Sequence, residues 1–184
     1  MTKGETITAI HYDARTRIYH WTSAVLVVVL WVMGRTTGLL PRGPFRVDVW
    51  SVHVLLGFGL TAVFALRLVW RFGSKRQGPP LERGLPHRIA GAAHSGLYCL
   101  LAAVVMLGIV NAFARGFPMF NLVKLPDFGL GALKHDVNAW HDLAANILAG
   151  IVGLHVAAAL YHHLIMRDRT LVAMLPLRSD DSNL

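Results

Sequence analysis

The most constraining feature of the sequence is a set of four long segments without a single Asp, Glu, Lys or Arg residue. A helix needs about 20 mainly apolar residues to cross the hydrocarbon core of a bilayer. The segments lie between Arg17 and Arg35, Asp48 and Arg67, Arg88 and Arg115, and Asp142 and Arg167, and enclose 17, 18, 26 and 24 residues. They predict four membrane-spanning helices, near residues 17–39, 48–71, 88–114 and 138–167.

The composition supports this class of protein. Hydrophobic residues make up 54% and charged residues 15% of the 184 residues, whereas a soluble domain carries about 25% charged residues. A soluble four-helix bundle would need a polar face on each helix, and a membrane β-barrel would show alternating segments of about ten residues. We therefore predict an all-α, integral membrane, up-down four-helix bundle that forms one domain over residues 1–184. Its only cysteine, Cys99, excludes an intramolecular disulfide, a thiolate zinc site and covalent haem attachment.

The distribution of Lys and Arg predicts the orientation of the bundle. Twelve of the 18 basic residues lie on the side of both termini and the second loop, and six lie on the other side. Because short cytoplasmic loops carry the excess of Lys and Arg, both termini are expected in the cytoplasm. The net charge of +8 then reflects topology and attraction to anionic lipid, and no binding of nucleic acid is expected. The six residues on the outer side are Arg35, Arg42, Arg46, Arg115, Lys124 and Lys134.

Ten histidines are present, and each predicted span carries at least one. An ionisable residue inside a membrane indicates a functional site, although a single histidine can also cap a helix end or lie at the interface. His141 and His155 are 14 residues apart, which places them on nearly the same helix face with a rise of about 21 Å. In an up-down bundle, His20 then lies level with His155 toward the cytoplasm, and His53 lies level with His141 toward the outer side.

Two imidazoles per level, without a carboxylate or thiolate, fit the axial positions of haem b, because the macrocycle supplies the other four ligands. A structural zinc ion would need four protein ligands. We predict two non-covalent b haems, bound by His20 with His155 and by His53 with His141. Arg67 shares the helix face of His53 and is expected either to bind a haem propionate or to extend toward the membrane surface.

Four stretches carry a resemblance to the bacterial cytochrome b561 family: IYHW at 18–21, SVHV at 51–54, WHDLA at 140–144 and GLHVAAA at 153–159. The sequences YHH at 161–163 and RDRTL at 167–171 match the family's C-terminal part as well. The resemblance implies a multi-pass protein of the bacterial inner membrane with two b haems on the same four histidines. It also implies oxidation of superoxide to oxygen at the periplasmic face and reduction of ubiquinone.

On this reading, His162 is expected to act as quinone ligand or proton donor beside the cytoplasmic haem, with His163 and His94 as weaker candidates. The basic residues of the outer side would attract superoxide. The expected partners are the lipid bilayer, superoxide and ubiquinone, without an obligate protein partner. One alternative is a haem b membrane anchor that passes electrons between the quinone pool and a dehydrogenase or hydrogenase. Another is a transporter or interaction protein without haem, whose histidines shuttle protons.

Overall fold

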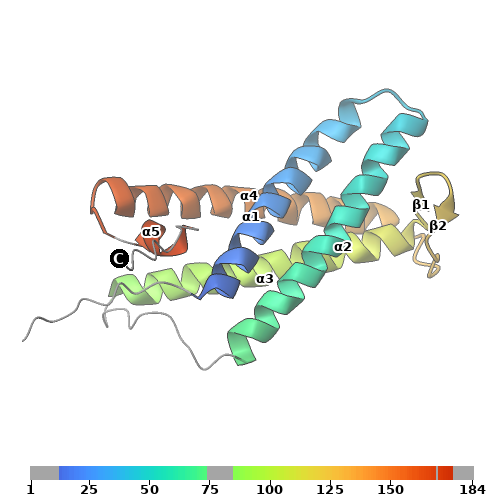
Figure 1. The fold of residues 1–184 in the computed structure, drawn as a ribbon. Helices are drawn as coiled ribbons and strands as arrows, with labels where there is room; N and C mark the ends of the chain where they lie inside the picture. The colour runs from blue at the N-terminus through green and yellow to red at the C-terminus, as the bar shows by residue number, and fades with distance from the viewer. Residues whose placement is uncertain (1–12, 74–84, 169, 176–184) are drawn as a thin grey trace, which may run out of the picture.

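The computed structural model describes residues 13–73, 85–168 and 170–175, and most of them are helical (Figure 1). Two short strands and one 3-10 turn are the other regular elements among these residues, and turns and loops connect them. The elements in chain order are α1 (Ala14–Thr36), η1 (Thr37–Leu39), α2 (Pro44–Gly73), α3 (Leu85–Ala114), β1 (Pro118–Met119), β2 (Val123–Lys124), α4 (Lys134–Leu164) and α5 (Thr170–Met174).

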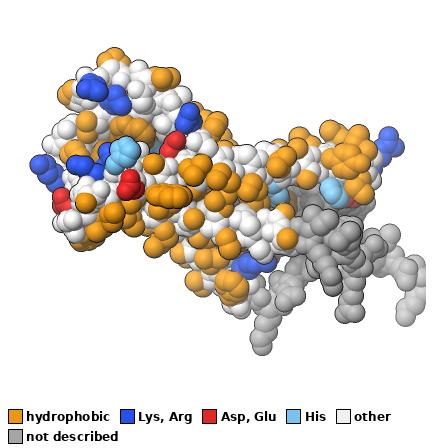
Figure 2. Space-filling model, turned by 180° about the vertical axis from the view of Figure 1, so that it is seen from behind, with side chains coloured by type: hydrophobic (Ala, Val, Ile, Leu, Met, Phe, Trp, Pro, Cys, Tyr) orange, Lys and Arg blue, Asp and Glu red, His pale blue; other side chains and the backbone are white. Residues whose placement is uncertain are grey.

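Four of the described helices are long and apolar enough to cross a membrane, with mean hydropathy from 1.5 to 2.3 over their most apolar windows. Little of this apolar surface is buried inside the protein; for α4 the buried share of the window is 6%. Hydrophobic side chains accordingly cover much of the helical surface in Figure 2. Exposed apolar surface on this scale needs a lipid solvent. Four long apolar helices therefore lie close to the four predicted spans, and they imply a membrane protein.

Each long helix begins three or four residues before its predicted start, and its end lies within three residues of the predicted end. Helix α2 begins at Pro44, before the expected start at residue 48, because proline is well tolerated in the first turn of a helix, where its missing N–H has no helical partner. Helix α4 ends at Leu164, before the expected residue 167, and Arg167 has a φ of 54° in the turn that follows. That turn leads into α5, which the sequence did not predict.

The four long helices pack as two antiparallel pairs, α1 with α2 and α3 with α4, and one pair runs obliquely across the other (Figure 1). Packing within each pair is more extensive than between the pairs. The buried core where the pairs meet draws on all four helices and consists of Leu30, Leu60, Phe64, Leu101, Val105 and Leu148. On α4, Leu148 lies between His141 and His155, so this apolar core separates the two predicted histidine levels.

A small hairpin follows α3 at the end of the bundle that carries His53. Strands β1 and β2 pair antiparallel, and the turn residues Phe120 and Asn121 have φ values of 51° and 57°. The Phe120 N–H donates a hydrogen bond of 2.8 Å to the hydroxyl oxygen of Ser51, a fully buried residue of α2. The hairpin is thereby attached to α2 two residues before His53.

Several expectations concern residues outside the described ranges. They include both chain ends, whose cytoplasmic placement the charge pattern predicts, and most of the basic second loop. The same holds for His11 and the side chain of His87, which we expect from the sequence to be solvated.

Candidate functional site

His53 of α2 and His141 of α4 face each other, with ring centroids 6.5 Å apart and ring planes crossed at 87°. Two imidazoles bound to one metal through Nε2 have centroids about 6 Å apart, because each metal–nitrogen bond is about 2 Å and the ring centre lies about 1 Å beyond the nitrogen. The observed separation of the ring centres is therefore close to that of two imidazoles that share one metal. The predicted proximity of the two residues is present in the structure.

Hydrogen bonding at this level also suits a metal ligand. The Nδ1–H of His141 donates to the backbone carbonyl of Val104 on α3 over 3.0 Å. Its Nε2 then carries the lone pair, which is the usual arrangement of a metal-binding histidine. Nδ1 of His53 is buried and has no hydrogen-bond partner among the described residues.

A cavity of about 380 Å³ surrounds the two histidines. Its volume lies within the range of small-molecule sites, which run from about 300 to 1,000 Å³. All four long helices contribute to its mainly apolar wall, including Leu30, Val54, Leu101, Val105, Gly108, Ala145 and Leu148. The chemistry of this cavity, with two imidazoles in a mainly apolar enclosure, fits haem b.

Polar residues of the cavity wall form a rim of paired groups. Arg35 of α1 donates to Asp142 of α4 over 3.3 Å, and both side chains are more than half exposed. Asn111 of α3 donates to Asn138 over 3.3 Å and accepts a hydrogen bond of 2.9 Å from Arg115. The rim therefore carries Arg35 and Asp142, and Arg115 lies next to it through its hydrogen bond to Asn111.

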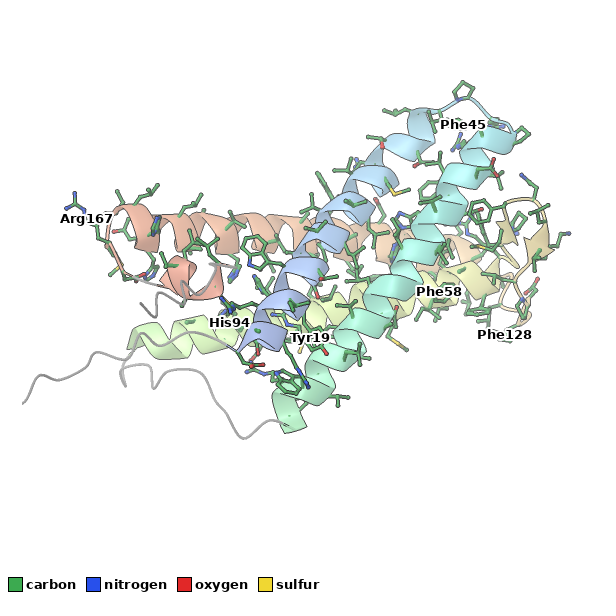
Figure 3. The ribbon with its side chains drawn as sticks, in the orientation of Figure 1. Tyr19, Phe45, Phe58, His94, Phe128 and Arg167 are labelled. Carbon is green, nitrogen blue, oxygen red and sulfur yellow. The ribbon has the colours of Figure 1, made fainter. Side chains whose placement is uncertain are left out.

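The second level contains three histidines, one more than the predicted pair. Electrostatic interactions connect His20 of α1 with His155 of α4 and with His94 of α3. The rings of His94 and His155 are in edge contact, with centroids 5.5 Å apart. His94 lies on α3 near the part of α1 that carries Tyr19 (Figure 3). The sequence gives no iron ligand role to His94, and its contact with His155 depends on packing between α3 and α4.

Arg67 of α2 lies at this second level. Its guanidinium donates to Nδ1 of His20 over 3.2 Å and lies 4.9 Å from the centre of the Tyr98 ring. Arg71, one helical turn later, lies 5.3 Å from the same ring. Since an arginine only donates hydrogen bonds, Nδ1 of His20 accepts here, and the proton of a neutral ring is on Nε2. Arg67 is thus close to the predicted ligand His20, and iron binding through Nε2 of His20 requires this hydrogen bond to be exchanged.

His162 and His163 lie at the end of α4, where the chain turns toward α5. Nδ1 of His162 is 2.6 Å from a carboxylate oxygen of Asp168, and the Asp168 N–H donates to the His162 carbonyl over 3.1 Å. Nδ1 of His163 is buried without a hydrogen-bond partner among the described residues. Helix α5 is attached to α1 through the Trp21 indole N–H, which donates to the Met174 carbonyl over 2.7 Å. The geometry gives His162 a part in this turn, and its catalytic role stays a prediction.

Comparison with known proteins identifies the family to which the sequence is similar. The sequence model of the prokaryotic cytochrome b561 family matches residues 11–177. The chain is 28% identical to a probable superoxide oxidase, CybB, of Yersinia pestis, over 85% of this chain and 91% of that protein. It is 29% identical to cytochrome b561 homolog 2 of Escherichia coli K12, over 96% of this chain and 97% of that protein. It is 27% identical to cytochrome b561 homolog 1 of the same strain, over 90% of this chain and 97% of that protein.

This family consists of membrane electron-transfer proteins that bind haem b. The match covers all four membrane helices and both histidine levels. Together with the apolar cavity between His53 and His141, it establishes the class of the protein and confirms the resemblance found in the sequence. The chain is a member of the prokaryotic cytochrome b561 family.

Proposed function

We propose that the chain is a single-domain di-haem protein that takes electrons from superoxide on the outer side of the bacterial inner membrane and delivers them to ubiquinone. The observation that carries the haem assignment is the 6.5 Å separation of the His53 and His141 rings across an apolar cavity. His20 and His155 hold the second haem in this proposal. The first haem lies toward the outer side, and the second lies toward the cytoplasm.

Haem b supplies a one-electron ferric/ferrous couple, which is the chemistry that a path from superoxide to quinone needs. The residues of the chain bind it, orient it and exclude water from it. The Val104 carbonyl holds the proton of His141 on Nδ1 and makes Nε2 available. The apolar core around Leu60 and Leu148 keeps the space between the two levels free of water. Arg67, which contacts His20 in the structure, is the residue that we assign to a haem propionate at the second level.

The assignment of the substrate rests on the relative named as a probable superoxide oxidase and on charge at the cavity rim. Superoxide is an anion, and positive groups beside an opening raise its local concentration and its association rate. Arg35 lines the cavity, and Arg115 contacts the lining residue Asn111. Two superoxide anions each give up one electron and leave as oxygen, and one ubiquinone takes up two electrons and two protons. We assign the proton transfer at the quinone to His162, whose imidazole is half-buried and paired with Asp168.

The first test is a haem count on the detergent-purified protein, made with a pyridine haemochrome assay and a reduced-minus-oxidised spectrum. We expect two b haems per chain, and one after His53→Ala or His141→Ala. His135→Ala is the matched control, because its side chain is 94% exposed, and it should retain both haems. A colourless protein, or equal haem in all variants, would refute the assignment.

The second test addresses the reaction. Superoxide generated in solution should reduce the purified protein without any partner, and added ubiquinone should reoxidise it. Reduction that depends on a dehydrogenase or hydrogenase subunit would favour the membrane-anchor alternative. Fusion of a fluorescent or phosphatase reporter to either terminus tests the proposed orientation, because only cytoplasmic ends give a fluorescent fusion and an inactive phosphatase.

A further inference from the structure

Helix α3 contributes no predicted ligand to the His53–His141 level, yet its backbone lies close against the His141 ring. A Cβ atom built on Gly108 would lie 3.0 Å from Cε1 of the His141 ring, 3.5 Å from Nδ1 and 3.8 Å from Nε2. These three distances mean that the imidazole ring lies directly against the α3 backbone. Any side chain at position 108 would have to push the ring away.

The same stretch of α3 provides the hydrogen bond that orients this ring. Val104 precedes Gly108 by one helical turn, and its carbonyl accepts the His141 Nδ1–H over 3.0 Å. A hydrogen bond of this length forms only if the ring approaches the α3 backbone closely, and the missing side chain at Gly108 permits that approach. The carbonyl and the glycine therefore act together on one imidazole.

We infer that Gly108 is a positioning residue of the proposed haem site. Together with the Val104 carbonyl, it holds the His141 ring so that Nε2 is free to bind iron and the ring plane is crossed with that of His53. This inference rests on the proposed function, because it concerns a haem between these two histidines. The crossing angle is 87°, and for metal-bound histidines the partner of the second ring nitrogen commonly fixes both tautomer and ring orientation. The chain thus sets the orientation of one ligand from a helix that itself supplies none at this level.

Other glycines show that the close approach is particular to Gly108. A Cβ on Gly34, which also lines the cavity, would have a single neighbour, the Cε1 atom of His53, at 3.8 Å. That distance is an ordinary van der Waals contact. Gly96 lies on α3 as well, is exposed and would place its Cβ in open space. The three positions form a graded series for substitution by alanine.

The test compares Gly108→Ala, Gly34→Ala and Gly96→Ala in the purified holoprotein by haem content and by electron paramagnetic resonance of the ferric state. The anisotropy of a low-spin ferric haem signal is largest when the two axial imidazole planes are perpendicular. Since the planes here are close to perpendicular, a rotation of His141 can only lower the largest g value. We expect Gly108→Ala to lower it and to weaken haem binding at this level by about ten- to a hundredfold. Gly96→Ala should leave both properties unchanged, and Gly34→Ala should have the smaller effect of the two cavity variants.

A second measurement covers the case in which Gly108→Ala loses the haem altogether. In the haem-free wild-type protein, nitrogen chemical shifts of His141 should report a proton on Nδ1, and in the haem-free variant they should report the other tautomer or a mixture. Unchanged shifts and unchanged resonance signals in Gly108→Ala would overturn the inference while leaving the haem proposal intact. A wild-type protein without haem would instead refute the proposed function.

Discussion

One hydroxyl group links the β1–β2 hairpin to α2 by a hydrogen bond. Ser51 is fully buried, donates to the Val47 carbonyl over 2.8 Å and accepts the Phe120 N–H over 2.8 Å. The substitution Ser51→Ala removes both hydrogen bonds and leaves the Phe120 N–H without its acceptor. Because Ser51 lies two residues before His53, this hydroxyl connects the loop after α3 to the helix that carries a predicted ligand.

The magnitude follows from the surroundings of each group. An unsatisfied buried donor costs about 1–3 kcal/mol. Phe120 as a whole residue is 38% exposed, so it lies where water can replace the lost acceptor after the substitution. We therefore expect the lower end, a loss of about 1 kcal/mol in the free energy of unfolding. Ser23→Ala is the matched control, since Ser23 is 3% exposed and donates to the Tyr19 carbonyl over 2.7 Å. Ser23 makes no hydrogen bond to another helix or strand among the described residues. In Ser23→Ala, the loss of the hydrogen bond within α1 is offset by the better helix propensity of alanine.

Unfolding in mixed micelles with increasing SDS, followed by circular dichroism, measures the difference between the two variants. Hydrogen exchange at the Phe120 amide gives a local measure, and about 1 kcal/mol corresponds to about fivefold faster exchange. Equal unfolding midpoints for the two serine variants, together with an unchanged Phe120 exchange rate, would refute the reasoning that this hydroxyl holds the hairpin.

Two further predictions concern polar contacts at other depths of the bundle. Trp31→Phe removes the indole N–H of α1 that donates to the Asn146 side-chain oxygen of α4 over 3.1 Å. It should lower the free energy of unfolding in SDS by about 0.6 kcal/mol, the average for hydrogen bonds between membrane helices. A loss of several kcal/mol would contradict this prediction. Asp168→Asn replaces the carboxylate that contacts His162 by an amide that still offers an oxygen. Both side chains are more than a third exposed, so we expect the free energy of unfolding, measured by thermal denaturation, to change by about 1 kcal/mol or less. A larger loss would show that the turn depends on the negative charge of Asp168.

The sequence predicted the architecture well because the membrane imposes a strong pattern. A run of residues without charge has few structural outcomes in lipid, so the four spans are found close to their expected positions. The hairpin and α5 were not predicted. The turn of the hairpin places Phe120 at a positive φ, where glycine or asparagine is the usual signal, and α5 has only five residues, too few to show a helical period.

The candidate site was predicted in part. Helical spacing and antiparallel topology were sufficient to bring His53 near His141, because both follow from the rise and the turn of a regular helix. The partners of these residues were not predictable in the same way. The Val104 carbonyl and the contact at Gly108 depend on how closely α3 approaches α4, and a backbone carbonyl leaves no trace in a residue pattern. The contact between His94 and His155 depends on the same approach.

The two histidine levels differ in how far they are prepared for a metal. At the His53–His141 level, the Val104 carbonyl already holds the proton on Nδ1, and the ring separation suits one iron. At the other level, Arg67 occupies Nδ1 of His20, so the proton of the neutral ring must move before Nε2 can bind iron.

Haem should therefore enter the His53–His141 level first when the haem-free protein is titrated with haemin, because no hydrogen bond has to be exchanged there. At the second level, Arg67 must first leave His20, and a haem propionate is the partner that we propose for it. A stopped-flow titration should show two phases, of which His141→Ala removes the fast one and Arg67→Gln accelerates the slow one. If Arg67→Gln left the slow phase unchanged, the hydrogen bond to His20 would not be what delays haem at the second level.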